Sequence, residues 1–206
     1  VMGYSTILAV PIFQDTVTAI LIAVATSITV AAVVTFILGG KASAEASKDK
    51  AITPEKNMLY APIAGDYITL KEINDGVFSE GMLGQGCGII PEGGVVFSPV
   101  NGEVASIADS KHAIGITSED GAEILIHIGL DTVAMNGKGF TPLVKTGDKV
   151  KAGQRVLEFD VPAIIAAGHA TTSAFIITNS DDCKLIDLKT GGHYDVADVF
   201  GTVEVK

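Results

Sequence analysis

The sequence has little cysteine and few basic residues, and each shortage excludes a class of protein. Cys87 and Cys183 are the only cysteines in 206 residues, too few for a disulfide-dense secreted scaffold or a structural zinc cluster. Residues 59–206 hold 10 basic and 20 acidic side chains, which accounts for the net charge of −10. A domain with this charge and no basic stripe is not expected to bind nucleic acid, and it favours partners with basic surfaces.

Charged residues are also missing from one long segment, residues 16–40, which lies between Asp15 and Lys41. As a helix, this segment would be about 37 Å long, enough to cross a hydrocarbon core of about 30 Å. A buried core helix of this kind would need a larger protein around it, and a signal peptide would begin with Met and a basic flank. The segment therefore predicts a transmembrane helix.

The residues on either side of this helix predict how it is connected. Residues 1–13 are apolar, and because the chain begins at Val1 rather than Met, we expect it to be the end of a longer membrane protein. No Lys or Arg precedes Lys41, so the positive-inside rule places the C-terminal side in the cytoplasm. Residues 41–58 are rich in Ala, Ser, Lys and Glu without an apolar period, which predicts a flexible linker.

From residue 59 onward, short β-branched runs alternate with turn residues, a pattern typical of an all-β sandwich or barrel. One short helix is expected, with Asp160 as its N-cap, Pro162 in its first turn and Gly168 at its end. The candidate strands are Gly65–Leu70, Gly88–Pro91, Gly94–Ser98, Gly102–Ile107, Ala113–Thr117, Glu123–Ile128, Arg155–Phe159 and Ala174–Ile177.

Two of the four histidines fall in neighbouring candidate strands. The two-residue period of residues 123–128 puts Leu125 and His127 on the face opposite three isoleucines. His112 begins the preceding strand, and a hairpin across residues 119–121 would bring the two imidazoles side by side. This geometry is compatible with two interpretations of His127: a core histidine whose hydrogen bonds are satisfied within the protein, or one member of a paired-histidine site.

Two histidines without a metal cage suit nucleophilic chemistry at nitrogen. A neutral imidazole is a good nucleophile near pH 7 and can carry a phosphoryl group. The second imidazole would donate a hydrogen bond to the phosphoryl oxygens, and the apolar strand would exclude water that hydrolyses phosphohistidine. The other histidines, His169 and His193, lie in polar, glycine-containing stretches and are expected to be solvent-exposed and uninvolved.

Residues 121–133, Gly-Ala-Glu-Ile-Leu-Ile-His-Ile-Gly-Leu-Asp-Thr-Val, resemble the phosphorylation signature of the glucose-type enzyme IIA domain of the bacterial phosphoenolpyruvate-dependent sugar phosphotransferase system. The resemblance includes Ala-Pro-Ile-Ala-Gly-Asp at 61–66, Pro-Val-Asn-Gly at 99–102 and Ser-Lys-His-Ala-Ile-Gly-Ile at 110–116. It implies an antiparallel β-sandwich of the duplicated hybrid motif type, and a phosphotransferase that needs no cofactor and no metal.

The resemblance also assigns roles to individual residues. His127 would take phosphate from the phosphocarrier protein HPr and pass it to a IIB domain. His112 corresponds to the second active-site histidine, and Ser110 stands where the family usually has a threonine that steadies it. Serine keeps the hydroxyl, so this role is expected to survive. Asp75 and Asp131 correspond to an acidic pair at the rim of the site, where they are expected to contact partner proteins.

The order of segments implies a particular kind of permease. Only the predicted linker separates the membrane helix from the IIA-like domain, so no IIB domain fits between them. The Gly-Ile-Ile-Pro after Cys87 also lacks the arginine of a IIB phosphocysteine motif. The order IIB, IIC, IIA resembles the β-glucoside, sucrose and trehalose permeases.

We therefore interpret the chain as the C-terminal fragment of a IIBCA permease in the bacterial inner membrane. Residues 1–40 would be the end of the membrane IIC domain, residues 41–58 the linker, and residues 59–206 a IIA domain facing the cytoplasm. The expected partners are HPr, a IIB domain of the same or a partner chain, and the lipid bilayer through residues 16–40.

Three other functions compete with this interpretation. A lysostaphin-like metallopeptidase needs an H-x-H element and a third zinc ligand. This sequence has Ile-Gly after His127 and lacks that element. Two neighbouring histidines could still bind zinc adventitiously. A biotinyl or lipoyl carrier needs an exposed lysine at a hairpin tip, beside Met or Asp, and neither Lys111 nor Lys138 has that setting. The remaining alternative is a regulatory IIA-like protein that binds partners without being coupled to transport.

Overall fold

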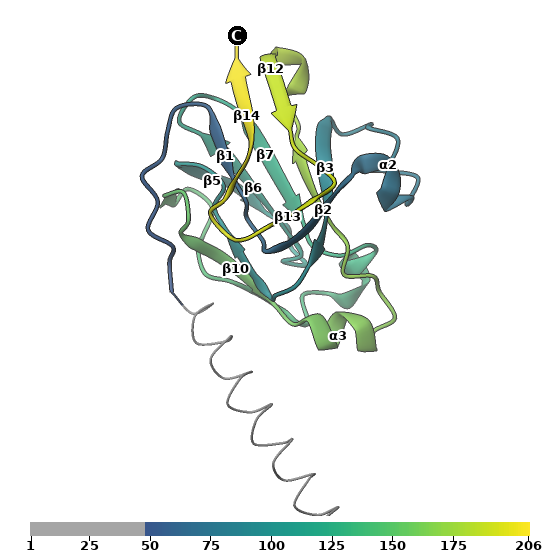
Figure 1. The fold of residues 1–206 in the computed structure, drawn as a ribbon. Helices are drawn as coiled ribbons and strands as arrows, with labels where there is room; N and C mark the ends of the chain where they lie inside the picture. Colours follow the sequence, from purple (N-terminus) through teal and green to yellow (C-terminus); the bar gives the residue numbers. More distant parts are fainter. Residues whose placement is uncertain (1–47) are drawn as a thin grey trace, which may run out of the picture. The chain divides into compact units, whose positions relative to one another are not determined.

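The computed structural model describes residues 48–206, so the predicted transmembrane helix at 16–40 lies outside the described residues. The longest helix within the described range has six residues, and none there could cross a membrane. Residues 48–206 form one unit of antiparallel strands with a few short helices (Figure 1). The prediction of an all-β, antiparallel fold is confirmed.

The described strands form three sheets. The largest has eight strands in the order β13-β2-β3-β11-β7-β6-β5-β9, and the three-stranded sheets have the orders β1-β14-β12 and β4-β10-β8. The strands are β1 (Met58–Tyr60), β2 (Gly65–Thr69), β3 (Gln85–Pro91), β4 (Val95–Phe97), β5 (Gly102–Ile107), β6 (Ala113–Ser118), β7 (Glu123–His127), β8 (Phe140–Pro142), β9 (Lys149–Val150), β10 (Arg155–Phe159), β11 (Ser173–Ile177), β12 (Cys183–Leu188), β13 (Gly192–Tyr194) and β14 (Val199–Val205). The helices are α2 (Leu70–Ile73), α3 (Val161–Ala166) and the short 3-10 turns η1 (Thr132–Met135) and η2 (Ser180–Asp182).

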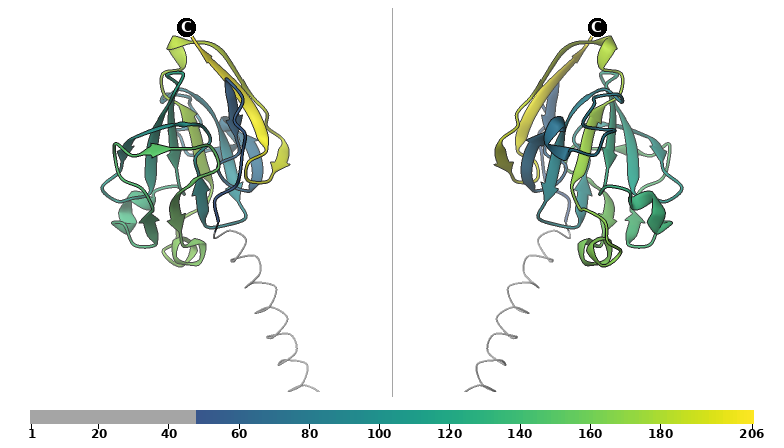
Figure 2. Two further views of the ribbon diagram at one scale, coloured as in Figure 1. Left: turned by 90° about the vertical axis from the view of Figure 1, so that its left-hand side faces the viewer. Right: turned by 90° about the vertical axis from the view of Figure 1, so that its right-hand side faces the viewer.

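Alternation along the strands of the large sheet buries one face in the main core. Both views in Figure 2 show the sheet of β1, β14 and β12 lying to one side of the large sheet. Three fully buried aromatic rings join the two sheets, because Phe200 of β14 contacts Tyr67 of β2 and Phe175 of β11, each at 5.0 Å between ring centroids. The opposite face of the large sheet carries a second, smaller apolar cluster, made of Ile73, Phe78, Ala174 and Ile176.

Each of the eight candidate strands corresponds to an observed strand, with ends that differ by up to three residues. The predicted helix is observed as α3, where Ala163 N donates to Asp160 Oδ1 at 3.0 Å and Gly168 follows the last turn at φ +84°. Six further strands, among them β12, β13 and β14, were not predicted. No residue of β12 or β13 is fully buried, so neither strand shows a strong apolar alternation.

The described end of the predicted linker runs along the domain. Lys50 N donates to Gly153 O at 2.9 Å, and Arg155 N donates to Asp49 Oδ1 at 2.9 Å. Residues 48–57 consequently belong to the same unit as the sheets.

Candidate functional site

Strand pairing between β6 and β7 brings His112 and His127 together. Ala113 is the register partner of His127, and Ile128 N donates to the carbonyl oxygen of His112 at 2.8 Å. The two imidazole centroids lie 4.5 Å apart, with the rings nearly perpendicular at 80°. The predicted hairpin is confirmed, and it places one histidine ring against the edge of the other.

His127 lies on the outer face of the large sheet, beside the second apolar cluster. It shares this face with Leu125, which packs against that cluster, and its own register partner on β11 is Ala174. The Phe78 ring contacts the imidazole in an edge geometry, with 4.9 Å between centroids. The His127 side chain is therefore only partly accessible to water.

This environment controls the charge of His127. Burial lowers the pKa of the imidazole, and neighbouring His112 lowers it further, to about 4. The carboxylates of Asp75 and Asp131 act in the opposite direction without cancelling this shift. His127 is thus a neutral imidazole at pH 7, the form that has a nucleophilic lone pair.

The two ring nitrogens of His127 have different surroundings. Nδ1 is buried, and a backbone hydrogen bond with Gly129 raises the pKa of the ring without cancelling the effect of burial. Nε2 is therefore the nitrogen that an incoming group can reach.

His112 is also buried, with 7% of its surface exposed. Burial lowers the pKa of its imidazole, which favours a neutral ring. Its Nδ1 lies 2.8 Å from Ser110 Oγ, so the Ser110 hydroxyl holds one of its ring nitrogens. The structure thus brings the three residues His127, His112 and Ser110 into one cluster.

The turn after β7 is tightly packed beneath the site. Gly129 has a left-handed φ of +71° and its N–H donates to Ser173 Oγ at 3.3 Å. A Cβ on Gly129 would lie 2.5 Å from Thr132 Cγ2 and 2.8 Å from the carbonyl oxygen of Ala170. Asp131 follows in the same turn, exposed and at φ +57°, where it is free to contact a partner protein.

Asp75 is engaged within its own loop. Its carboxylate accepts hydrogen bonds from the backbone N–H groups of Val77 (3.3 Å), Phe78 (3.2 Å) and Ser79 (2.9 Å). Burial raises the pKa of Asp75, but these donors lower it more, so its pKa lies below the ordinary value. The carboxylate is therefore ionised at pH 7 and fixes the turn that contains Phe78.

The two remaining histidines lie in other surroundings. His193 is exposed, as predicted, and its Nδ1 is 3.1 Å from Asp66 Oδ1, a hydrogen bond that raises the pKa of the imidazole. His169 is half-buried rather than exposed, because its backbone N–H donates to the carbonyl oxygen of Ile164 and returns the chain onto α3. Within residues 48–206, no three His, Cys, Asp or Glu side chains gather closely enough to hold a metal ion.

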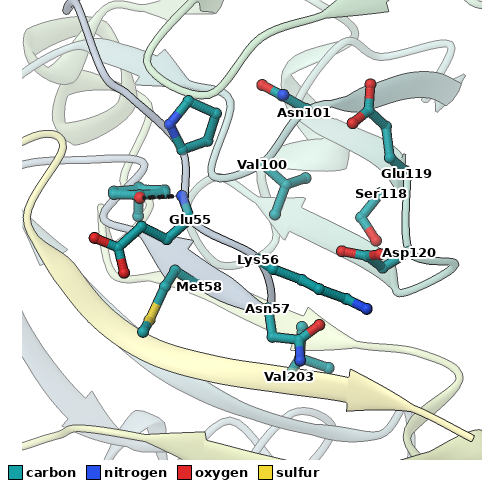
Figure 3. A pocket seen from close by; sticks show the side chains of 12 residues that line it. Glu55, Lys56, Asn57, Met58, Val100, Asn101, Ser118, Glu119, Asp120 and Val203 are labelled. Atoms are coloured by element: carbon teal, nitrogen blue, oxygen red, sulfur yellow. Dashed lines mark hydrogen bonds between the residues drawn. The ribbon is translucent and has the colours of Figure 1, made fainter.

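A cavity of about 250 Å³ lies elsewhere on the domain, between the start of β1, the β6–β7 turn and β14 (Figure 3). Glu55 N donates to the hydroxyl of Tyr60 at 2.9 Å in one wall, and Lys56 extends towards Asp120. None of the predicted site residues lines this cavity, so it has no part in the histidine site.

Sequence reasoning missed Phe78, the ring that contacts His127. The adjacent Asp75-Gly76 pair is a turn signal, but it does not reveal which residue of the turn points inward. The contact depends on the approach of the loop to β7, which no short-range pattern encodes.

Comparison with known proteins gives consistent matches. A family model described as phosphoenolpyruvate-dependent sugar phosphotransferase system, EIIA 1, matches residues 57–183. The β-glucoside-specific EIIBCA component of Dickeya chrysanthemi is 44% identical over 137 residues, which are 66% of this chain and 22% of that protein. The glucose-specific EIIA component of Staphylococcus epidermidis is 43% identical over 141 residues, 68% of this chain and 85% of that protein.

The solved structure of glucose permease IIA from Mycoplasma capricolum is similar in fold, with a TM-score of 0.67 and 34% identity. The match covers 74% of this chain and 98% of that one. The chain spans only about a fifth of the length of the β-glucoside relatives that it matches.

Proposed function

We propose a function from one premise: the chain belongs to the phosphoenolpyruvate-dependent sugar phosphotransferase system EIIA 1 family. In this proposal the domain is a phosphotransferase component that accepts a phosphoryl group from phospho-HPr on His127 and passes it to a IIB domain, which phosphorylates the sugar during uptake. The observation that carries the proposal is the neutral, half-buried imidazole of His127 against a second imidazole, that of His112.

The neutral ring makes the first transfer direct. The Nε2 lone pair of His127 attacks phosphorus, and the bond from phosphorus to the donor breaks as its electron pair returns to the donor. The proton of the neutral imidazole stays on Nδ1, which is buried. The pKa of about 4 keeps the ring neutral at pH 7, and the backbone hydrogen bond with Gly129 would hold its proton on Nδ1, so that Nε2 has a free lone pair for the attack.

His112 and Ser110 would steady the phosphoryl group. When the Ser110 hydroxyl donates to His112 Nδ1, the proton of the neutral His112 ring lies on Nε2. That N–H can donate to a phosphoryl oxygen and balance the negative charge that develops during transfer. The apolar side chains around His127 keep out water that would hydrolyse the phosphohistidine.

We further propose that the chain is the C-terminal part of a β-glucoside-type IIBCA permease. The match to EIIBCA components of Dickeya chrysanthemi and Bacillus subtilis supports this assignment. Residues 16–40 would then anchor the chain in the inner membrane, with the domain, a β-sandwich of the duplicated hybrid motif type, in the cytoplasm. Asp75 and Asp131 would attract basic surfaces on the two phosphotransfer partners.

Phosphorylation by radiolabelled phospho-HPr tests this function. The full chain is expected to take up the label and release it to a IIB domain and sugar, whereas His127→Ala should take up none. His193→Ala is the matched control and should keep wild-type uptake, since His193 lies on β13 with Asp66. Label that enters the His127→Ala variant at an unchanged rate would contradict the assignment. Uptake without onward transfer to a IIB domain and sugar would favour a regulatory protein.

A further inference from the structure

We propose that Asp75 and Phe78 are positioning residues for His127. The Asp75 carboxylate fixes the turn at residues 75–79 so that the Phe78 ring covers the imidazole, keeps water from it and holds its orientation. This inference rests on the proposed function in one respect, that His127 is the residue that accepts phosphate.

The hydrogen bonds of Asp75 account for the shape of the turn. Both carboxylate oxygens are used, with Oδ1 accepting from Val77 N and Ser79 N, and Oδ2 accepting from Phe78 N. Gly76 N donates to Ser79 Oγ at 2.9 Å and closes the turn further. Side-chain caps of this kind replace the backbone pairing that a loop lacks, and they fix the direction in which the side chains point.

Phe78 is the side chain in this loop that points inward. It is 7% exposed, whereas Val77 is 50% and Met82 is 77% exposed. It packs with Ile73, Ala174 and Ile176 in the second apolar cluster and touches His127 with its ring. His127 therefore has contacts with two rings, those of His112 and Phe78, at 4.5 Å and 4.9 Å between centroids.

Two possible roles of Asp75 have opposite consequences for His127. If Asp75 acts only through its charge, which raises the pKa of His127, then replacement by either Asn or Ala lowers that pKa. If Asp75 acts through Phe78, Ala loosens the turn, water reaches the imidazole and the pKa rises towards the ordinary value. Asn keeps one acceptor oxygen, which can serve Val77 N and Ser79 N, but has no second acceptor for Phe78 N, so it should raise the pKa less than Ala does. The other titratable groups that act on His127 are His112 and Asp131.

The test is the titration of the His127 ring in the full chain, followed by NMR. Phe78→Ala and Asp75→Ala are each expected to raise the titration midpoint by about one pH unit or more, since both restore hydration. Phe78→Leu, which keeps an apolar cover, should retain the low midpoint, and the midpoint of Asp75→Asn should lie below that of Asp75→Ala. Asp131→Asn is the control for charge alone, and it should lower the midpoint or leave it unchanged.

An Asp75→Ala midpoint equal to or below that of Asp75→Asn would overturn the role of Asp75, and an unchanged midpoint in Phe78→Ala would overturn the role of Phe78. If either alanine variant fails to fold, Phe78→Tyr and Phe78→Ser replace it. A wild-type midpoint in Phe78→Tyr with a raised midpoint in Phe78→Ser would support the role of the Phe78 ring as a cover for His127. Equal midpoints in these two variants would overturn that role. The titration needs no phosphate, so it is independent of whether His127 is the acceptor. Phosphoryl uptake at 1 M salt, where the charge of Asp75 is largely screened, adds a second measurement, in which Asp75→Ala should be slower than Asp75→Asn.

Discussion

Acidification from pH 7 to pH 4 is expected to remove stability from the domain through His127. In the unfolded chain the imidazole binds a proton near its ordinary pKa of 6.5, whereas in the folded domain burial and His112 lower the pKa to about 4. The unfolded state therefore binds more protons between these two values, and acid favours unfolding. This contribution is fully present above pH 6.5 and is lost as the pH falls towards 4.

The size of the effect follows from the gap between the two pKa values. That gap is worth about 3 kcal/mol of unfolding free energy, a large share of the stability of a typical domain. Carboxylates also titrate in acid, so the comparison is with His127→Gln, whose amide does not titrate. Urea unfolding of both proteins between pH 7 and pH 4 should show the wild type losing about 3 kcal/mol more than the variant. Equal losses would mean that the folded imidazole is as well hydrated as the unfolded one, which refutes the buried site.

Three further outcomes are expected. His112→Ala removes the N–H donor, so it should pass phosphate to IIB on the order of 10²–10³-fold more slowly, whereas His112→Gln keeps an N–H donor and should be slowed less. Rapid-quench measurement of both variants checks this, and equal slowing of the two would mean that His112 only shapes the site. Uptake from phospho-HPr should slow as salt shortens the Debye length from about 10 Å at 0.1 M to about 3 Å at 1 M. The double variant Asp75→Asn with Asp131→Asn should flatten that dependence, and a salt-insensitive wild type would count against the acidic rim. Gly129→Ala should lower the unfolding free energy by about 2 kcal/mol. Gly168→Ala should lower it less, because a Cβ at Gly168 meets nothing within 4 Å, and urea unfolding of both variants measures the difference.

The hairpin that carries the site was predictable because several local signals agree. The isoleucines of β7 alternate with polar or half-buried residues, and turn residues separate β7 from β6. Once the two strands pair, Ala113 lies opposite His127, and the neighbouring residue His112 is brought into contact with His127. Similarly, Asp160 and Gly168 mark the ends of α3 by local chemistry alone.

The contact of Phe78 with His127 could not be predicted in this way. It joins a loop to a strand far along the chain, and it depends on how three backbone N–H groups turn towards Asp75. The resemblance implies a rim position for Asp75, and nothing in the local sequence indicates that its carboxylate also fixes the turn that contains Phe78. The strand β12 was not predicted for another reason, because none of its residues is fully buried and its apolar alternation is therefore weak.

The central claim is that Nε2 of His127 receives the phosphoryl group. Phosphorylation of the ¹⁵N-histidine-labelled full chain by phospho-HPr, followed by NMR detection of the phosphorus–nitrogen coupling, identifies the bonded atom directly. The account predicts one phosphorylated imidazole, coupled through Nε2, with the signal absent from His127→Ala. Coupling to His112 or to Nδ1 of His127, or a phosphorylated chain without any phosphorus–nitrogen coupling, would contradict it.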